Sequence, residues 1–169
     1  DITVFVPKYD TNLSRYSRNS MGDEQQETGP FGESVLRRQY LAENEDGPNV
    51  KAYTAYGLTE VIDELTNHGD CEDLTILMLK DSYSAPISSF LSLTAKKVIS
   101  VDYRYEKRGI DEIMEKYNPD IVIVSFSRMM FEEHNLFKEE TGYTIGKYIS
   151  EKRLFLARSC IMKGMSVTD

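Results

Sequence analysis

Three continuous apolar runs in the second half of the chain constrain its fold more than any other feature. They cover residues 74–80, 96–105 and 120–127. A continuous run, without alternation, is typical of a strand that is buried on both faces of a parallel sheet. Strands that alternate with short helices form right-handed βαβ units. The sequence therefore predicts an α/β fold of the three-layer flavodoxin-like kind, with a mainly parallel sheet flanked by helices.

The stretches between and after these runs predict helices. Residues 84–95 fit a short helix, and residues 109–118 place apolar side chains at i, i+3, i+4 and i+7. The dipeptide Asn118-Pro119 ends the second of these helices. A terminal helix is predicted over residues 141–164.

The first half of the chain is less regular. Residues 2–9 and 50–57 are rich in β-formers and predict strands, whereas residues 32–43 predict a short helix. Residues 58–65 fit either a helix or a hairpin strand. Residues 10–32 are polar and have no period, so they predict a long loop, which in a compact domain is usually functional or mobile. We expect residues 1–169 to form a single domain.

Composition excludes several classes of function. A formal net charge of −8 argues against a nucleic-acid footprint and against binding to an anionic membrane surface. The chain contains no apolar run of about 18 residues, so it is not expected to cross a membrane. Its two cysteines, Cys71 and Cys160, fit no zinc spacing, and either free thiols or one bridge stays open. No metal or nucleotide motif is present, so no cofactor is expected.

Polar residues follow each apolar run, where a parallel sheet places its ligands. The first run ends in Lys80-Asp81-Ser82. Ser82 has two interpretations: a nucleophile on a strand-to-helix turn, or a cap of the next helix. The other two runs end in Asp102-Tyr103-Arg104-Tyr105 and in Ser125-Phe126-Ser127-Arg128.

The block around Ser82 resembles a known family. It reads ILMLKDSYSAPISSFL and is followed by VISVDYRY. This pattern resembles the nucleophile block of the SGNH hydrolase-like proteins, above all the DHHW family, which is similar to the alginate O-acetyltransferase group. That family has a [GK]-D-S-[FY] turn, a small residue and Pro, then Phe-Leu, and a second strand that ends in D-x-R-Y. The matching residues are Asp81, Ser82, Tyr83, Pro86, Phe90, Leu91, Asp102, Arg104 and Tyr105.

The resemblance implies a role for Ser82 and raises the question of its base. By resemblance Ser82 is the nucleophile, whereas the family's His-Asp pair lies in an upstream DHHW motif that this chain lacks. The chain is thus expected to be the C-terminal part of such a domain, or a relative without the pair. His134 is the remaining candidate base, and its other interpretation is an exposed helix residue. His68 is expected at the opposite edge of the sheet.

The remaining site residues have more than one interpretation. Asp81 positions the turn, orients Ser82 or caps the helix. Ser127 or Arg128 is a candidate oxyanion donor in place of the Asn that ends the third strand in ordinary SGNH enzymes. Arg104 either pairs with Asp102 or holds a saccharide or carboxylate, and Tyr105 lies in the same predicted substrate-binding group.

Two functions follow from the sequence. The first is a serine esterase or O-acetyltransferase that passes an acyl group to a cell-envelope glycan or to water. The alternative is a non-catalytic SGNH-like domain that binds a glycan or a protein partner. A receiver-like switch domain fits less well, because the first strand lacks its acidic cluster. By resemblance the domain faces the bacterial cell envelope or the outside, and any membrane link lies in a segment outside this chain.

Overall fold

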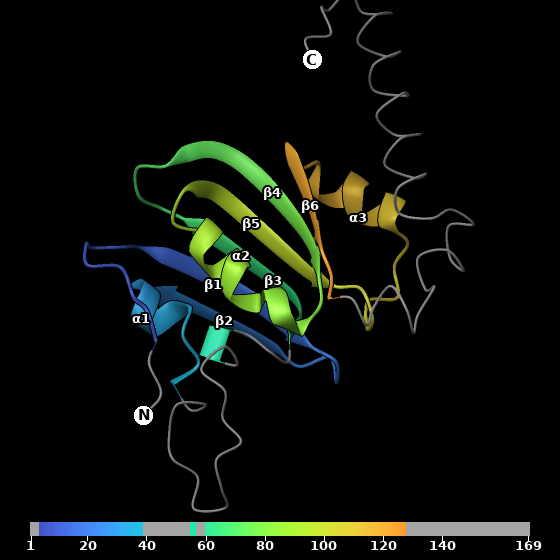
Figure 1. The fold of residues 1–169 in the computed structure, drawn as a ribbon, viewed down its shortest axis with the longest axis horizontal. Helices are drawn as coiled ribbons and strands as arrows, with labels where there is room; N and C mark the ends of the chain where they lie inside the picture. The colour runs from blue at the N-terminus through green and yellow to red at the C-terminus, as the bar shows by residue number, and fades with distance from the viewer. Residues whose placement is uncertain (1–3, 39–54, 57–59, 128–169) are drawn as a thin grey trace, which may run out of the picture. The chain divides into compact units, whose positions relative to one another are not determined.

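A computed structural model describes residues 4–38, 55–56 and 60–127, which contain a six-stranded sheet in the order β2-β1-β3-β5-β4-β6 (Figure 1). The predictions for residues 39–54 and for the terminal helix at 141–164 lie outside the described residues. The elements are β1 (Leu13–Asn19), β2 (Glu24–Gly29), α1 (Phe31–Ser34), β3 (Glu60–Asn67), β4 (Glu72–Lys80), the 3-10 turn η3 (Ser82–Ser84), α2 (Ala85–Leu91), β5 (Ala95–Asp102), α3 (Ile110–Tyr117) and β6 (Ile121–Ser125).

The three apolar runs form the parallel part of the sheet, as predicted. Strand β4 lies between β5 and β6 and pairs with both in parallel. Leu77, Met78 and Ile99 are completely buried, which explains why the runs of β4 and β5 show no alternation. The prediction of a buried strand is wrong for β6, whose Ile121 and Val122 are 42% and 41% exposed. The predicted helices α2 and α3 connect β4 to β5 and β5 to β6. The α/β class is confirmed.

The prediction of a long loop over residues 10–32 is wrong. This segment forms the hairpin β1–β2, and β1 pairs antiparallel with β3, which pairs antiparallel with β5. The sheet is therefore mixed rather than mainly parallel. The inward side chains of β1 are Leu13, Arg15 and Ser17. Because two of the three are polar, the strand lacks the alternation of apolar and polar residues that predicts a half-buried strand.

Three smaller predictions in the first half also change. Residues 58–65 belong to a strand, β3, and not to a helix. Residues 4–9 and 55–56, the described parts of two predicted strands, lie outside any strand. The helix predicted from residue 32 begins at Phe31 and ends at Ser34. Propensity alone misplaced these short segments because pairing partners, not local preference, decide which segment joins a sheet.

The hydrophobic core lies between the sheet and α2, which crosses one of its faces in Figure 1. Phe90 of α2 packs against Phe31 and Tyr56, with ring centroids 5.6 Å and 5.5 Å apart. Leu65 and its partner Val98 belong to this cluster. We call this side of the sheet the α2 face.

Helix α3 covers the opposite face. Its Ile110 and Ile113 are buried, and the Tyr117 hydroxyl at its end donates to Glu64 Oε1 at 2.7 Å. Glu64 is next to Leu65 on β3, so its side chain leaves the sheet on the other side. The sheet thus carries α2 on one face and α3 on the other.

Glu106 fastens the segment between β5 and α3. Its carboxylate accepts hydrogen bonds from Arg108 Nη2 at 3.0 Å and from Arg18 Nη2 at 2.8 Å. Burial alone would raise the pKa of Glu106, but the hydrogen bonds and charge of Arg108, with the charge of Arg18, lower it to about 2. The stabilisation is therefore complete above the ordinary value of 4.5 and is lost as the pH falls toward 2.

We expect Glu106→Gln to reduce this acid sensitivity. The free energy of unfolding of the wild type should fall more steeply below pH 4.5 than that of the variant, as measured by urea denaturation across the acid range. Parallel curves for the two proteins would show that Glu106 is not the group that titrates.

Candidate active site at the carboxyl ends of β4, β5 and β6

The structure brings the three polar strand ends together. Lys80 at the end of β4 is in register with Asp102 at the end of β5 and with Ser125 at the end of β6. Ser82 follows at once, and Arg104 and Tyr105 follow Asp102. The residues that the sequence assigned to one edge of the sheet thus lie side by side, at the edge where open parallel sheets bind ligands.

Ser82 is not a helix cap. The residue that caps η3 is Asp81, and α2 begins after Ser84, whose side chain makes no capping bond. Instead, Ser84 Oγ lies 2.7 Å from Ser125 Oγ. The side chain of Ser82 is half-buried and has no hydrogen-bond partner among the residues that the structure describes. Of the two interpretations of Ser82, the capping one is wrong.

Asp81 holds the turn that carries Ser82. It is 1% exposed, and its Oδ1 accepts from the Tyr83 backbone N–H at 3.0 Å. Its Oδ2 accepts from the backbone N–H of Ser127, just after β6, at 2.5 Å. Both oxygens are therefore engaged with backbone donors, which gives Asp81 a positioning role. The Ser127 amide is likewise committed to Asp81 and is not available to an oxyanion.

We expect Asp81→Asn to loosen this turn. An Asn side chain keeps one acceptor oxygen and turns an NH₂ group toward one of the two backbone donors. The free energy of unfolding should fall by about 1–3 kcal/mol, and the reactivity of Ser82 toward a serine probe should fall with it. Urea denaturation and probe-labelling rates measure the two effects.

Asp120→Asn is the matched control for this prediction. Asp120 Oδ2 accepts from the Thr75 backbone N–H at 2.8 Å, a comparable bond between β4 and the start of β6, at the far end of both strands. This variant should lose stability without changing the reactivity of Ser82. An equal loss of reactivity in both variants would show that Asp81 acts only through general stability.

Arg104 forms an ion pair with Asp102. Its Nε and Nη2 donate to the two carboxylate oxygens at 2.9 Å and 2.6 Å. The hydrogen bond to Asp102 is the main cause that raises the pKa of Arg104. The prediction of an ion pair is confirmed, and the Arg104 fork is not free to hold a substrate carboxylate at two points. Tyr105 is 57% exposed, and its ring centroid lies 5.3 Å from the Arg104 guanidinium carbon.

The two histidines are placed differently. His134, together with Arg128, lies outside the described residues. His68 follows β3, which runs antiparallel to β5, so it lies at the edge opposite Ser82, as predicted. Its Nε2 is 2.8 Å from Ser14 Oγ. Over residues 4–38, 55–56 and 60–127, no cluster of His, Cys, Asp and Glu side chains could hold a metal ion.

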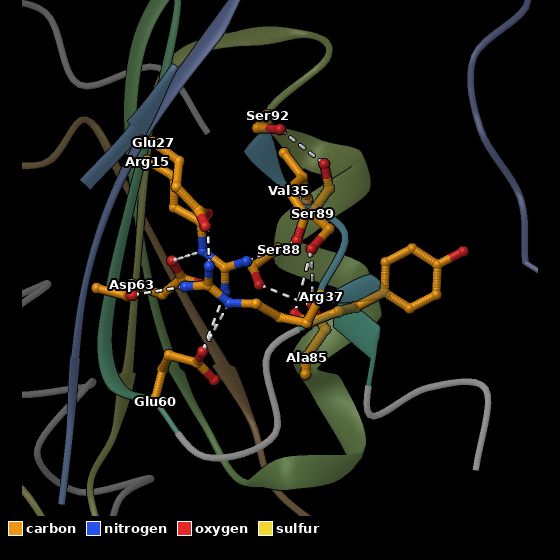
Figure 2. A network of polar contacts seen from close by, with 12 residues as sticks. Arg15, Glu27, Val35, Arg37, Glu60, Asp63, Ala85, Ser88, Ser89 and Ser92 are labelled. Carbon is orange, nitrogen blue, oxygen red and sulfur yellow. Dashed lines mark hydrogen bonds and ion pairs between the residues drawn. The ribbon is translucent and has the colours of Figure 1, made fainter. Parts of the chain in front are cut away.

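A buried polar network beside the site was missed by the sequence analysis (Figure 2). Arg15 donates from Nε and Nη2 to both oxygens of Asp63, each at 2.7 Å, and from Nη1 to the Val35 carbonyl at 2.6 Å. Arg37 donates to Glu60 Oε1 at 3.2 Å and also pairs with Glu27. The only signal was the polar alternation in the segment that was interpreted as a loop.

Comparisons with known proteins show the fold. No family model and no curated protein matches this chain. PatB1 of Bacillus cereus, solved with a sulfonyl adduct, is similar at 18% identity and a TM-score of 0.54, over 74% of this chain and 40% of PatB1. A second PatB1 structure gives 17%, 0.53, 75% and 39%. A DHHW family protein from Eubacterium siraeum gives 16%, 0.50, 77% and 39%.

These likenesses define the class of fold to which the chain conforms. It is the α/β fold with a mixed sheet that PatB1 and the DHHW family protein also have. The chain spans about 40% of the length of these proteins. Among the described residues, no helix is long and apolar enough to cross a bilayer.

Proposed function

We propose that this protein is a serine O-acetyltransferase or esterase of the SGNH-like kind that acts on a cell-envelope glycan. The observation that carries the proposal is the position of Ser82. Ser82 is half-buried and caps no helix. It lies at the carboxyl end of β4, which pairs in parallel with β5 on one side and β6 on the other. The DHHW-like sequence of the same turn and the fold shared with PatB1, which was solved with a sulfonyl adduct, support it.

The proposed reaction has two steps through an acyl-serine. Ser82 Oγ attacks the ester carbonyl of an acyl donor, and its proton goes to a general base. The donor alcohol leaves with a proton, and the acyl group stays on Ser82. A glycan hydroxyl or water then attacks the acyl-serine and restores the free hydroxyl. Transfer and hydrolysis differ only in this second nucleophile.

The surroundings of Ser82 suit this chemistry. Asp81 fixes the turn, and the Asp102–Arg104 pair lies at the end of the neighbouring strand β5, in register with Lys80. The exposed Tyr105 ring next to Arg104 offers an aromatic surface of the type that stacks on sugars. By the same resemblance, we propose that the domain works outside the cytoplasmic membrane of a bacterium. His134 or a His-Asp pair from a longer natural protein would act as base.

A fluorophosphonate probe tests this proposal directly. The chain and any longer natural form of it are treated with the probe, and the adduct is located by peptide mass spectrometry. We expect modification at Ser82 and at no other serine. A longer natural form that stays unlabelled at Ser82, while it turns over an acetyl ester, would contradict the assignment of the nucleophile.

One observation favours a second function. Within the described part of the chain, no histidine lies near Ser82, because His68 is at the opposite edge. The alternative is a non-catalytic domain that binds a glycan or protein partner at the same strand ends. Calorimetric titration with envelope oligosaccharides distinguishes the two functions, since saturable binding without any turnover favours the second.

A further inference from the structure

Lys80 is an unusual residue for the last position of a buried strand. Its side chain is 1% exposed, and its Nζ has no hydrogen-bond partner. The other side-chain atoms in this state within the described residues are Glu60 Oε2 and Ser100 Oγ. Buried polar groups without a partner are rare, and each calls for an explanation. The proposed function so far gives Lys80 no role.

The carboxylates around Lys80 already have arginine partners. Asp102 is paired with Arg104 and Asp63 with Arg15, whereas Glu60 shares Arg37 with Glu27. Asp102, Asp63, Glu60 and Arg104 are the charged groups that act on Lys80, and α2 carries no charged residue. Burial lowers the pKa of Lys80, and the three carboxylates only partly oppose this effect. An ammonium group here would be buried without a hydrogen-bond partner.

The backbone brings Lys80 and Ser82 to the same side of the sheet. Lys80 is in register with Asp102 on the strand, and Asp81 is extended, with φ −107° and ψ −173°. The alternation of β4 therefore continues through Asp81, so Lys80 and Ser82 leave the backbone in the same direction. The rise over two strand residues is about 6.6 Å, a length that the four-carbon stem of lysine matches.

We propose that Lys80 is the proton acceptor for Ser82. Its side chain acts as a buried neutral amine at the end of β4, the strand that leads to the nucleophile. The inference rests on the proposed function, and it assigns the base to Lys80 in place of a histidine. As Ser82 Oγ bonds to the acyl carbon, its proton moves to Lys80 Nζ, which becomes an ammonium group. The ammonium then gives this proton to the leaving alcohol. In the second step the amine takes the proton of the glycan hydroxyl or of water, and that proton returns to Ser82 Oγ as the acyl group leaves.

Lys80→Met tests this role, because it removes the amine and keeps an unbranched side chain. Loss of a general base should slow fluorophosphonate labelling of Ser82 by about 10²–10⁴-fold. The thermal midpoint should stay equal to that of the wild type or rise, because the lost amine was buried without a partner. A residue with a purely structural role would not combine lost reactivity with kept stability. Lys96→Met, a change on the more exposed start of β5, is the control.

Wild-type measurements keep the test decisive even if the Lys80→Met chain fails to fold. The rate of Ser82 labelling should rise with pH and level off once the amine is neutral. Lysine-selective NMR should show one side chain that titrates below the others. The free energy of unfolding should rise with pH up to about 10.5, since the unfolded chain takes up a proton that the native chain refuses.

The outcomes separate this inference from the proposed function. Labelling of the wild type at Ser82 that is lost in Lys80→Met supports both. Equal labelling of the two proteins, with the same pH profile, overturns the role of Lys80 and leaves Ser82 as the nucleophile. A wild-type chain that is not labelled at any pH also overturns the role of Lys80, because Lys80 is present. The test of Ser82 as the nucleophile then passes to any longer natural form of the chain.

Discussion

Replacing Ser82 by Ala is expected to abolish acetyl-ester turnover, with a loss of about 10³-fold or more in kcat/KM. In the proposed mechanism the hydroxyl of Ser82 supplies the oxygen that carries the acyl group. Ser84, the next hydroxyl, is held against Ser125 at 2.7 Å. The measurement is turnover of a chromogenic acetyl ester, together with intact-protein mass spectrometry to detect an acetylated chain.

Ser14→Ala is the matched control for Ser82→Ala. Ser14 lies at the opposite edge of the sheet, where its hydroxyl contacts His68. This variant should keep full turnover, and both variants should unfold at nearly the wild-type denaturant concentration. Turnover that survives in Ser82→Ala would exclude an acyl-serine mechanism at Ser82.

Replacing Arg15 by Met is expected to cause the largest loss of stability, about 3–5 kcal/mol in the free energy of unfolding. Arg15 is completely buried, and its guanidinium satisfies both oxygens of Asp63 and the carbonyl of Val35. Without it the Asp63 carboxylate keeps its charge in a low-dielectric interior and loses its partner. Urea denaturation followed by circular dichroism gives the change.

The double variant Arg15→Met, Asp63→Leu tests whether the lost stability comes from the unpaired Asp63 charge or from lost packing. Removal of both charges leaves no orphaned carboxylate, so most of the lost stability should return. Arg38→Ala is the exposed control, because Arg38 is exposed and donates to the Gly32 carbonyl. It should change stability by less than about 0.5 kcal/mol. A double variant as unstable as Arg15→Met would show that the loss comes from packing and not from the unpaired charge.

The sequence predicted the parallel part of the fold and missed the antiparallel part. Continuous apolar runs identify β4, β5 and β6; burial on both faces accounts for the runs of β4 and β5, whereas Ile121 and Val122 of β6 are 42% and 41% exposed. Strand β1 is buried through Arg15 and Ser17, and β2 reads EQQETG without an apolar residue. The two strands form a hairpin, but without apolar alternation the local pattern carried no sign of it, and the other partner of β1, strand β3, lies far away in the sequence.

The candidate site was also predictable only in part. The convergence of Asp81, Ser82 and Asp102 followed from the rule that parallel strand ends share an edge. The pairing of Arg104 with Asp102 was anticipated because the two are close in sequence. The burial of Lys80 and its lack of a partner were not predictable, since they depend on which charges pair with Asp63 and Glu60 across the sheet.

The place of β3 in the sheet has a consequence for how the chain folds. Hairpin β1–β2 and the unit β4–α2–β5 each join strands that are neighbours in sequence, so each can form early. Strand β3 alone pairs with both, and its Asp63 is 48 residues from Arg15. Closing so long a loop is slow, and we expect the insertion of β3 to limit the folding rate. Before that step, Asp63 of β3 is not yet beside Arg15, and the carboxylates of β3 that act on Lys80 are not yet in place, so the buried polar network forms last.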